Sequence, residues 1–168
     1  MDPDSTILQI VILLVLIAIN AFFAMSEIAI VTFNDNKLKK MAEDGNKRAA
    51  ILHKMVSEPS KFLSTIQIGV TLAGFMAEPF AAFLSSYIPL PAAQTIALIS
   101  ITLLLAYFNL VLGELVPKRI AMHYPEKISL MVAPIIRFVF TISKPFVAVL
   151  SASTNLVLHL FGINADDQ

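Results

Sequence analysis

Segment 113–119 of the chain, with the sequence GELVPKR, combines residue types that can bind a hard cation at a membrane surface. It directly follows a charge-free apolar stretch, and its carboxylate, Glu114, stands next to Gly113. Pro117 lacks a backbone N–H and Gly113 tolerates unusual dihedral angles, so the pattern predicts a helix break that frees nearby carbonyl oxygens. Irregular backbone at membrane depth is tolerated only where it lines a cavity or binds something. A carboxylate beside freed carbonyl oxygens is therefore a candidate cation site.

An ordinary structural role competes with this interpretation, in which Glu114 lies among the lipid headgroups and pairs with Lys118 four residues later. Oxygen-bearing side chains in all three apolar stretches favour the cation site instead. These side chains are uncharged: Asn20 in the first stretch, Ser64 and Thr65 in the second, and Asn109 in the third. Each has an alternative explanation, because Ser and Thr can bond to their own helix and Asn can bridge two helices. Taken together, they indicate a cluster of hard oxygen ligands.

Composition places these residues in a membrane protein. Of the 168 residues, 57% are hydrophobic and 14% are charged, and the mean hydropathy is +0.79. These values are typical of one polytopic membrane domain and not of a soluble one. The formal net charge is zero, so no nucleic-acid partner is predicted. The chain has no cysteine, which excludes a disulfide framework, a thiolate metal site and a redox motif.

The distribution of basic residues predicts how the domain is oriented. All Lys and Arg residues fall within 37–61 and 118–144, whereas 5–26 and 79–113 carry no charge. Each charge-free stretch holds a run long enough to cross the hydrocarbon. Basic residues accumulate on the cytoplasmic side of a membrane. We therefore expect the N-terminus outside and the C-terminus in the cytoplasm.

The expected fold is all-α, with three membrane spans at about 7–33, 62–84 and 93–115. Helices on the inner face are expected at about 37–55 and 118–161, the first of them amphipathic with a turn at Gly45. Within the second span, small residues recur every four positions, a pattern that lets helices approach closely and predicts a face that packs on protein. They are Thr65, Gly69, Ala73 and Ala77.

The last apolar stretch, 128–161, is interrupted by charges and by Pro134 and Pro145. We expect it to form a broken helix that lies along the inner interface as a belt. The alternative is a fourth span at 145–161, which would place the acidic end of the chain outside. The polar residues in 145–161 make it a poor lipid-facing helix.

Three segments in order carry a resemblance to a known family: 20–27 (NAFFAMSE), 65–73 (TIQIGVTLA) and 113–118 (GELVPK). They are similar to the signatures of the membrane domain of the CorC/cyclin M (CNNM) family, and the resemblance covers nearly the whole chain. It implies a homodimeric Mg²⁺ transporter of the plasma (inner) membrane, with three spans per subunit and a belt-like juxtamembrane helix. It also implies export of Mg²⁺ in exchange for Na⁺, and cytosolic nucleotide-binding CBS domains downstream.

The resemblance also implies a set of metal ligands for the transported Mg²⁺, with Na⁺ as a coupling ion. Glu114 would be the charged ligand and Gly113 would offer its carbonyl. Side-chain oxygens would come from Asn20 and Ser64, with Thr65 and Ser26 as further candidates. The chain departs from the family pattern at Val70, where the family often has Asn. The site therefore either lacks that amide or takes an oxygen from elsewhere.

Two functions from other classes compete with transport. A membrane anchor that dimerises attached cytosolic modules would use Gly69 and Ala73 for packing and would leave Glu114 without a role. An intramembrane enzyme would use Glu114 as a general acid or base. The sequence contains neither H-E-x-x-H nor G-x-S-x-G, and no second acid is expected at membrane depth to pair with Glu114. We therefore do not expect an enzyme.

Overall fold

Long apolar runs and short polar breaks alternate along the chain, and each long run is helical in the computed structural model. The structure describes residues 3–85 and 91–161, and the side chains of 7–74, 96 and 99–161. Its elements are α1 (Pro3–Thr32), α2 (Asp35–Glu43), α3 (Lys47–Val56), α4 (Pro59–Ser85), α5 (Pro91–Leu110), the π-helical turn η1 (Val111–Leu115), α6 (Val116–His123) and α7 (Pro125–Leu160). No strand occurs among these described residues, so the predicted all-α class is confirmed for them.

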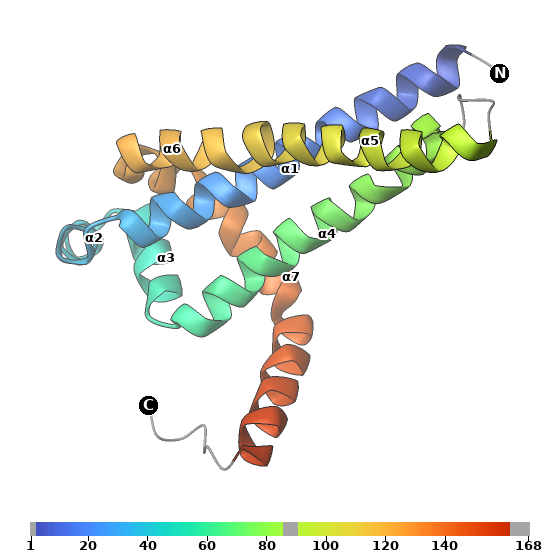
Figure 1. Ribbon diagram of the computed structural model, residues 1–168. Coiled ribbons are helices and arrows are strands. Elements are labelled where there is room, and N and C mark those ends of the chain that lie inside the picture. The colour runs from blue at the N-terminus through green and yellow to red at the C-terminus, as the bar shows by residue number, and fades with distance from the viewer. Residues whose placement is uncertain (1–2, 86–90, 162–168) are drawn as a thin grey trace.

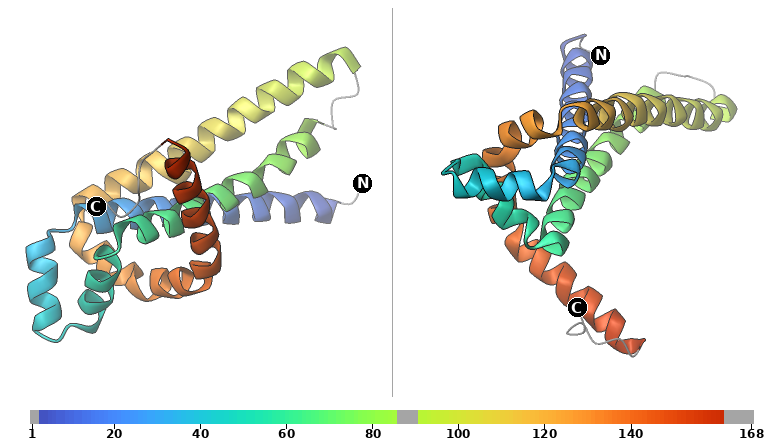
Figure 2. Two further views of the ribbon diagram at one scale, coloured as in Figure 1. Left: turned by 90° about the horizontal axis from the view of Figure 1, so that it is seen from below. Right: turned by 90° about the vertical axis from the view of Figure 1, so that its left-hand side faces the viewer.

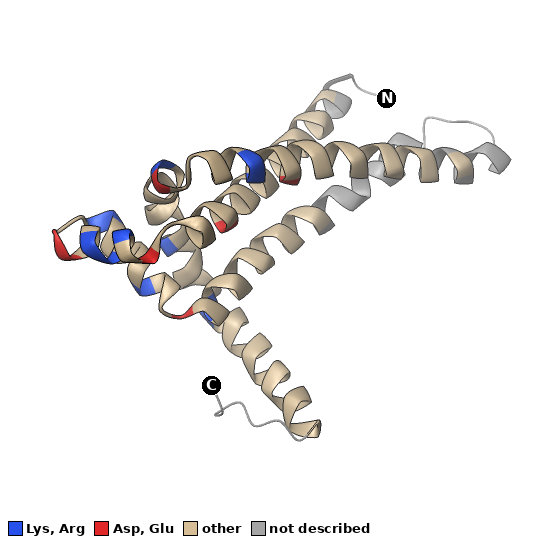
Figure 3. Cartoon of the chain, turned by 60° about the vertical axis from the view of Figure 1, so that its left-hand side comes forward, with Lys and Arg blue, Asp and Glu red and all other residues tan. Residues whose placement is uncertain are grey.

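Helix α1 is the centre of the arrangement and contacts α4, η1, α6 and α7. The start of α1, the end of α4 and the start of α5 lie at one end of the molecule, and α2 and α3 lie at the opposite end (Figures 1 and 2). Basic and acidic residues gather toward the end that carries α2 and α3 (Figure 3). The charged residues whose side chains the structure describes therefore concentrate toward one end of the long helices.

Among the residues whose side chains are described, three helical stretches are long and apolar enough to cross a membrane: Ile7–Thr32, Ile99–His123 and Pro125–Leu160. The first two overlap the expected spans at 7–33 and 93–115. The expected span at 62–84 falls on α4, whose side chains are described only as far as residue 74. By length and composition α7 is thus the third candidate, although the sequence predicted an inner-face helix there.

The expected amphipathic segment at 37–55 forms α2 and α3, and local hydrogen bonds explain where each helix begins. The Asn34 side chain accepts from the Lys37 backbone N–H at 3.0 Å, and the Asn46 side chain accepts from the Ala49 backbone N–H at 3.1 Å. Such side-chain caps satisfy amides that have no partner within the helix. Gly45 lies between the helices with φ of 89°, a left-handed conformation that glycine adopts easily. The predicted turn is confirmed.

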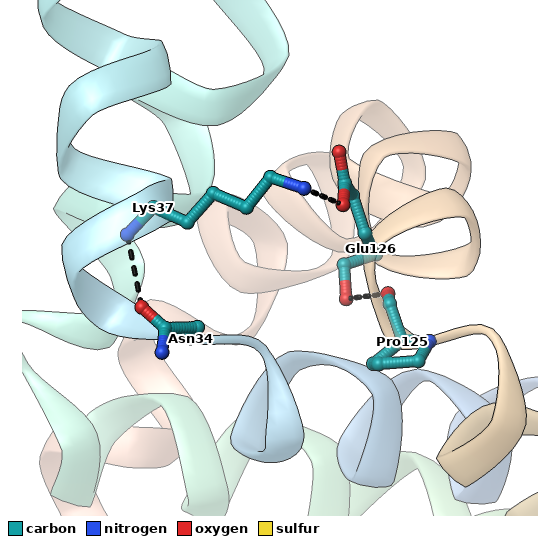
Figure 4. Close-up of polar contacts among 5 residues, drawn as sticks. Asn34, Lys37, Pro125 and Glu126 are labelled. Atoms are coloured by element: carbon teal, nitrogen blue, oxygen red, sulfur yellow. Dashed lines mark hydrogen bonds and ion pairs between the residues drawn. The ribbon is translucent and has the colours of Figure 1, made fainter.

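The short helices attach to the rest of the molecule through both apolar and charged contacts. Each has a buried face, formed by Leu38, Ala49, Leu52 and Met55. Lys37 of α2 also pairs with Glu126 at the start of α7 (Figure 4). Residues from the two basic windows are therefore brought to the same end of the fold.

The main core lies around the second half of α1. The largest fully buried side chains include Ile30, Leu52, Ile66, Val132 and Ile136, which come from α1, α3, α4 and α7. In contrast, the first half of α1 and the middle of α5 expose large apolar side chains. Exposed apolar helices of this kind are suited to contact with lipid.

Helix α7 is bent and not broken, which corrects one expectation. Its 36 residues stay helical past Pro134 and Pro145, and Figure 2 shows it bend along its length. Proline removes one backbone hydrogen bond and clashes with the preceding turn, which kinks a helix without ending it when packing supports both sides. The first half of α7 contributes to the core, whereas most side chains after Val147 are exposed.

The predicted break near Gly113 is also absent. The chain passes from α5 through η1 into α6 without leaving helical geometry, and the Val116 N–H donates to the Val111 carbonyl five residues earlier. Such wide turns often occur at functional sites. Pro117 falls in the first turn of α6, where a missing N–H is tolerated. The π-helical turn thus accommodates the proline that was expected to end the helix.

Candidate metal centre

Three residues from two long helices meet where α1 crosses the π-helical turn. The Asn20 amide nitrogen donates to Asn109 Oδ1 at 3.4 Å. Gly113 is buried directly beneath the pair: a Cβ atom at this position would lie 2.8 Å from Asn109 Oδ1 and 3.0 Å from Asn20 Nδ2. Only a residue without a side chain allows both amides to approach the backbone this closely. We call Asn20, Asn109 and Gly113 the asparagine cluster.

The Asn20 side chain carries an unsatisfied oxygen. Asn20 is 4% exposed, and its Oδ1 atom is buried without a hydrogen-bond partner. Leaving a buried acceptor unpaired costs about 1–3 kcal/mol. Amide and backbone carbonyl oxygens are common ligands of hard cations. The cluster therefore holds an oxygen that a bound cation would satisfy.

Glu114 follows the cluster but is engaged by a lysine. Lys118 Nζ lies 2.7 Å from Glu114 Oε1 and 3.7 Å from Glu27 Oε2. The Glu114–Lys118 pair is the ordinary alternative that the sequence predicted. Glu27 was not predicted as a partner, because the pairing depends on how α1 crosses α6. One ammonium group is thus shared by two carboxylates, which leaves this region with an excess of negative charge.

Ser26 and Thr65 are fully buried, but their hydroxyl groups bond within their own helices. Ser26 Oγ donates to the Phe22 carbonyl at 2.6 Å, and Thr65 Oγ1 donates to the Lys61 carbonyl at 2.9 Å. Ser26 is six residues from Asn20, about 9 Å along an α-helix. The structure therefore places Ser26 away from the asparagine cluster, and no described hydrogen bond joins Thr65 to it.

Ser64 lies in a different place, a groove of about 730 Å³ between α4 and α7. The groove is also lined by Glu27, Gln67 and Thr71. Ser64 thus shares a cavity with the second carboxylate and not with Gly113. The six predicted site residues divide between this groove, the asparagine cluster with Glu114, and the buried hydroxyls.

The predicted small-residue face of α4 packs against α1. A Cβ atom on Gly69 would lie 2.6 Å from the Phe23 ring, so this glycine allows the two helices to approach closely. Thr65 and Ala73 are buried, and Ala77 lies outside the described side chains. The prediction that this face meets protein is confirmed for the described positions. Val70 packs against the hydrophobic core and supplies no oxygen.

No group of three or more His, Asp or Glu side chains that could hold a metal occurs in the described part of the chain. A metal bound among the described residues would therefore have at most two such side chains as ligands, with uncharged oxygens or water for the rest. Mg²⁺ is often held by one or two carboxylates with other oxygens or water. The donor set of the asparagine cluster with Glu114 is of this kind.

Comparison with known proteins agrees with the three motifs. The cyclin M transmembrane N-terminal domain matches residues 11–168. The chain belongs to this family. The match includes every residue of the asparagine cluster and both carboxylates that share Lys118.

Curated relatives of this cyclin M domain occur in several bacteria. The chain is 38% identical to UPF0053 protein sll0260 of Synechocystis sp., over 99% of the chain and 40% of the relative. It is 31% identical to UPF0053 protein YugS of Bacillus subtilis, over 95% and 39%. It is 30% identical to UPF0053 inner membrane protein YfjD of Escherichia coli, over 88% and 34%. The chain thus spans about two fifths or less of the length of these relatives.

Proposed function

We propose that this cyclin M domain transports Mg²⁺ across the membrane and binds the ion beside the asparagine cluster. The observation that carries the proposal is the buried, unpartnered Oδ1 atom of Asn20, whose side-chain amide packs against Gly113, the residue that precedes Glu114. Family membership supports the same function.

The cluster offers the ligands that Mg²⁺ prefers. This ion takes near-octahedral oxygen coordination at about 2.0–2.1 Å and loses water reluctantly. Side-chain oxygens of Asn20 and Asn109 and the carbonyl of Gly113 would replace water, and Glu114 would supply charge. Pro117 has no N–H to donate to the Gly113 carbonyl four residues earlier, which leaves that oxygen available. Ser64, Thr65 and Ser26 would serve along the path to this site.

Lys118 gives the proposed site a way to balance charge. Its ammonium group pairs with Glu114. A cation that binds Glu114 must displace it, and Glu27 lies within reach as a second partner. If Lys118 moved to Glu27, that carboxylate would pair with the lysine and Glu114 would pair with the cation. Cation binding would then avoid the free-energy cost of leaving an unpaired ammonium group in a low-dielectric region.

We also propose that transport is outward and coupled to Na⁺. A membrane potential of about 100 mV, negative inside, opposes removal of a divalent ion by about 4.6 kcal/mol, twice the ~2.3 kcal/mol per charge. Two entering Na⁺ ions would cancel the electrical cost. A site with one carboxylate and neutral oxygens suits both ions in turn, with access from alternate sides of the membrane.

The remaining features of the proposal concern assembly. The domain would act as a homodimer in the plasma membrane, with its N-terminus outside and its C-terminus in the cytoplasm. The gathering of basic side chains at the α2–α3 end (Figure 3) supports that orientation. We propose no catalytic activity for it.

The test compares two acid–lysine pairs in vesicles that contain a Mg²⁺-sensitive dye. Glu114→Gln removes the carboxylate beside the cluster. Glu58→Gln is the matched control, because Glu58 also pairs with a lysine one turn later, at 2.6 Å, but lies outside the site. We expect Glu114→Gln to lower Mg²⁺ flux at least about tenfold, ~1.4 kcal/mol, and Glu58→Gln to leave it unchanged.

Two further results decide between transport and its alternatives. If both variants assemble normally and carry the same flux as the unaltered domain, Glu114 is not a ligand. If the unaltered domain carries no flux at all, the anchor function is favoured. A Mg²⁺ flux that is the same with and without a Na⁺ gradient would contradict coupling alone.

A further inference from the structure

A second polar region lies between α3, the start of α4 and α7. One pocket of about 560 Å³ is lined by Lys47, Lys54, Arg137 and Lys144. An adjoining pocket of about 490 Å³ shares Lys54 and Lys144 and adds Lys61. Glu58 and Phe140 also line both pockets. We call this continuous region the basic groove.

The basic groove has a large excess of positive charge. Glu58 is the one carboxylate among its described lining residues, and it pairs with Lys61. The other four basic side chains form no ion pair within the part of the chain that the structure describes. The hydrogen bond from Lys61 lowers the pKa of Glu58, and the charges of Lys54 and Lys144 contribute in the same direction. Lys54 and Lys144 also line both pockets.

The lining is also apolar on one side. Ile51, Met55 and Phe140 line the first pocket, and Phe140, Val147 and Ala148 line the second. A small inorganic anion has no apolar surface to bury against these residues and would interact only with the basic side chains. An amphiphile with an anionic head and an apolar tail satisfies both kinds of surface.

The surroundings of the groove are suited to acyl chains. On the same turns of α7 that line the groove, another face of the helix exposes Phe146, Val149 and Leu150. Helix α3, which carries Lys47 and Lys54 of the groove, lies toward the charged end of the molecule (Figures 1 and 3). Basic pockets between helices at the cytoplasmic side of a membrane recognise anionic lipid headgroups. The headgroup would thus meet the basic side chains of the groove, and the acyl chains would meet the exposed apolar face of the same stretch of α7.

We propose that the basic groove binds the phosphate headgroup of an anionic phospholipid. Lys54 and Lys144 would contact the phosphate, since each lines both pockets, while Lys47 and Arg137 would contact the outer part of the headgroup. Phe140 would separate the headgroup from the acyl chains. The proposal does not depend on the metal site, because the groove shares no residue with the asparagine cluster or Glu114.

The experiment measures lipid binding to the purified chain in uncharged detergent by native mass spectrometry. Short-chain phosphatidylglycerol is titrated against phosphatidylcholine of the same chain length. We expect the anionic lipid to bind about tenfold more tightly or better, since each basic residue near a lipid surface contributes measurably. The double variant Lys54→Gln, Lys144→Gln should lose that preference. The double variant Lys54→Arg, Lys144→Arg should keep it.

The matched control is Lys40→Gln, Lys127→Gln, which removes the same charge from two exposed residues outside the groove. It should bind phosphatidylglycerol within about twofold of the unaltered chain. Equal binding of the two lipids, or equal losses in the groove and control variants, would overturn the proposal. Displacement of the lipid by inorganic phosphate at the same concentration would also overturn it, in favour of a soluble phosphate ligand.

Discussion

The asparagine cluster with Glu114 and the basic groove have opposite chemistry within one set of helices. The first combines buried neutral oxygens with two carboxylates that share one lysine. The second combines five basic side chains with one carboxylate. One region therefore attracts cations and the other attracts anions.

Burial separates the two regions further. Asn20 and Gly113 are buried by helix packing, whereas Lys54 and Lys144 are exposed. A buried oxygen acts through geometry and is sensitive to displacements below 1 Å, but an exposed ammonium group acts through charge that salt screens. Substitutions that change shape should therefore affect the cluster, and substitutions that change charge should affect the groove.

The largest expected effect comes from removing the unpartnered oxygen. Asn20→Leu should weaken Mg²⁺ binding by about 10- to 100-fold, the range for losing a group that supports a metal site. Isothermal titration calorimetry of the purified domain measures the change. Asn155→Leu, on the exposed face of α7, is the control and should bind as the unaltered domain does. Equal affinities for both variants would remove Asn20 from the site.

Gly113→Ala tests whether Mg²⁺ affinity depends on the close approach of the two amide side chains to the backbone at this position. The new Cβ atom would lie 2.8 Å from Asn109 Oδ1, so one amide must move away. We expect Mg²⁺ affinity to fall about tenfold, ~1.4 kcal/mol, as measured by the same titration. Gly74→Ala is the matched control, since a Cβ atom there meets nothing within 4 Å. A Gly113→Ala variant that binds like the Gly74→Ala variant would contradict the close approach.

Lys118→Met should change affinity in the opposite direction. Without the ammonium group, Glu114 and Glu27 have no described partner, and a cation no longer competes for the carboxylate. We expect Mg²⁺ to bind about threefold to tenfold more tightly, about 0.7–1.4 kcal/mol. Lys61→Met, which removes the partner of Glu58, should leave Mg²⁺ affinity unchanged. Weaker Mg²⁺ binding by Lys118→Met would show that the lysine supports the site and does not compete with the ion.

The smallest effect is expected for Ser26→Ala. The hydroxyl donates to its own helix and lies almost two turns from Asn20. Mg²⁺ affinity should change less than about threefold, ~0.7 kcal/mol, in the same calorimetric assay. A loss as large as that of Asn20→Leu would extend the site along α1 and would reduce the contrast between the buried cluster and the rest of the helix.

Local signals were sufficient to predict much of the fold. The charge-free runs predicted α1 and the helix that contains Ile99–His123, because hydrophobic length alone decides such segments. The turn at Gly45 was also predicted, and the structure shows Asn34 and Asn46 capping the starts of α2 and α3 through bonds to residues near them in sequence. The bent course of α7 could not be predicted, since proline kinks or ends a helix according to what packs around it.

Contacts between residues far apart in the sequence could not be predicted from it. Gly113 and Glu114 were predicted from their immediate neighbours, and Asn109 from its place one turn earlier. The Glu27–Lys118 contact requires knowledge of how α1 crosses α6. The basic groove brings together residues from α3 and α7, about 90 positions apart. Sequence treated those lysines only as markers of the cytoplasmic side.

The π-helical turn rotates the part of the helix that follows it about the helix axis. A π-helical turn holds one residue more than an α-helical turn, and each residue of an α-helix advances it by about 100°. The inner part of the helix is therefore rotated by more than a quarter revolution relative to an uninterrupted helix. Because Lys118 follows the wide turn, that rotation sets the direction in which its side chain leaves the helix, from which it reaches Glu27 of α1 as well as Glu114. Conversion of the wide turn to an ordinary one would rotate the lysine away from α1.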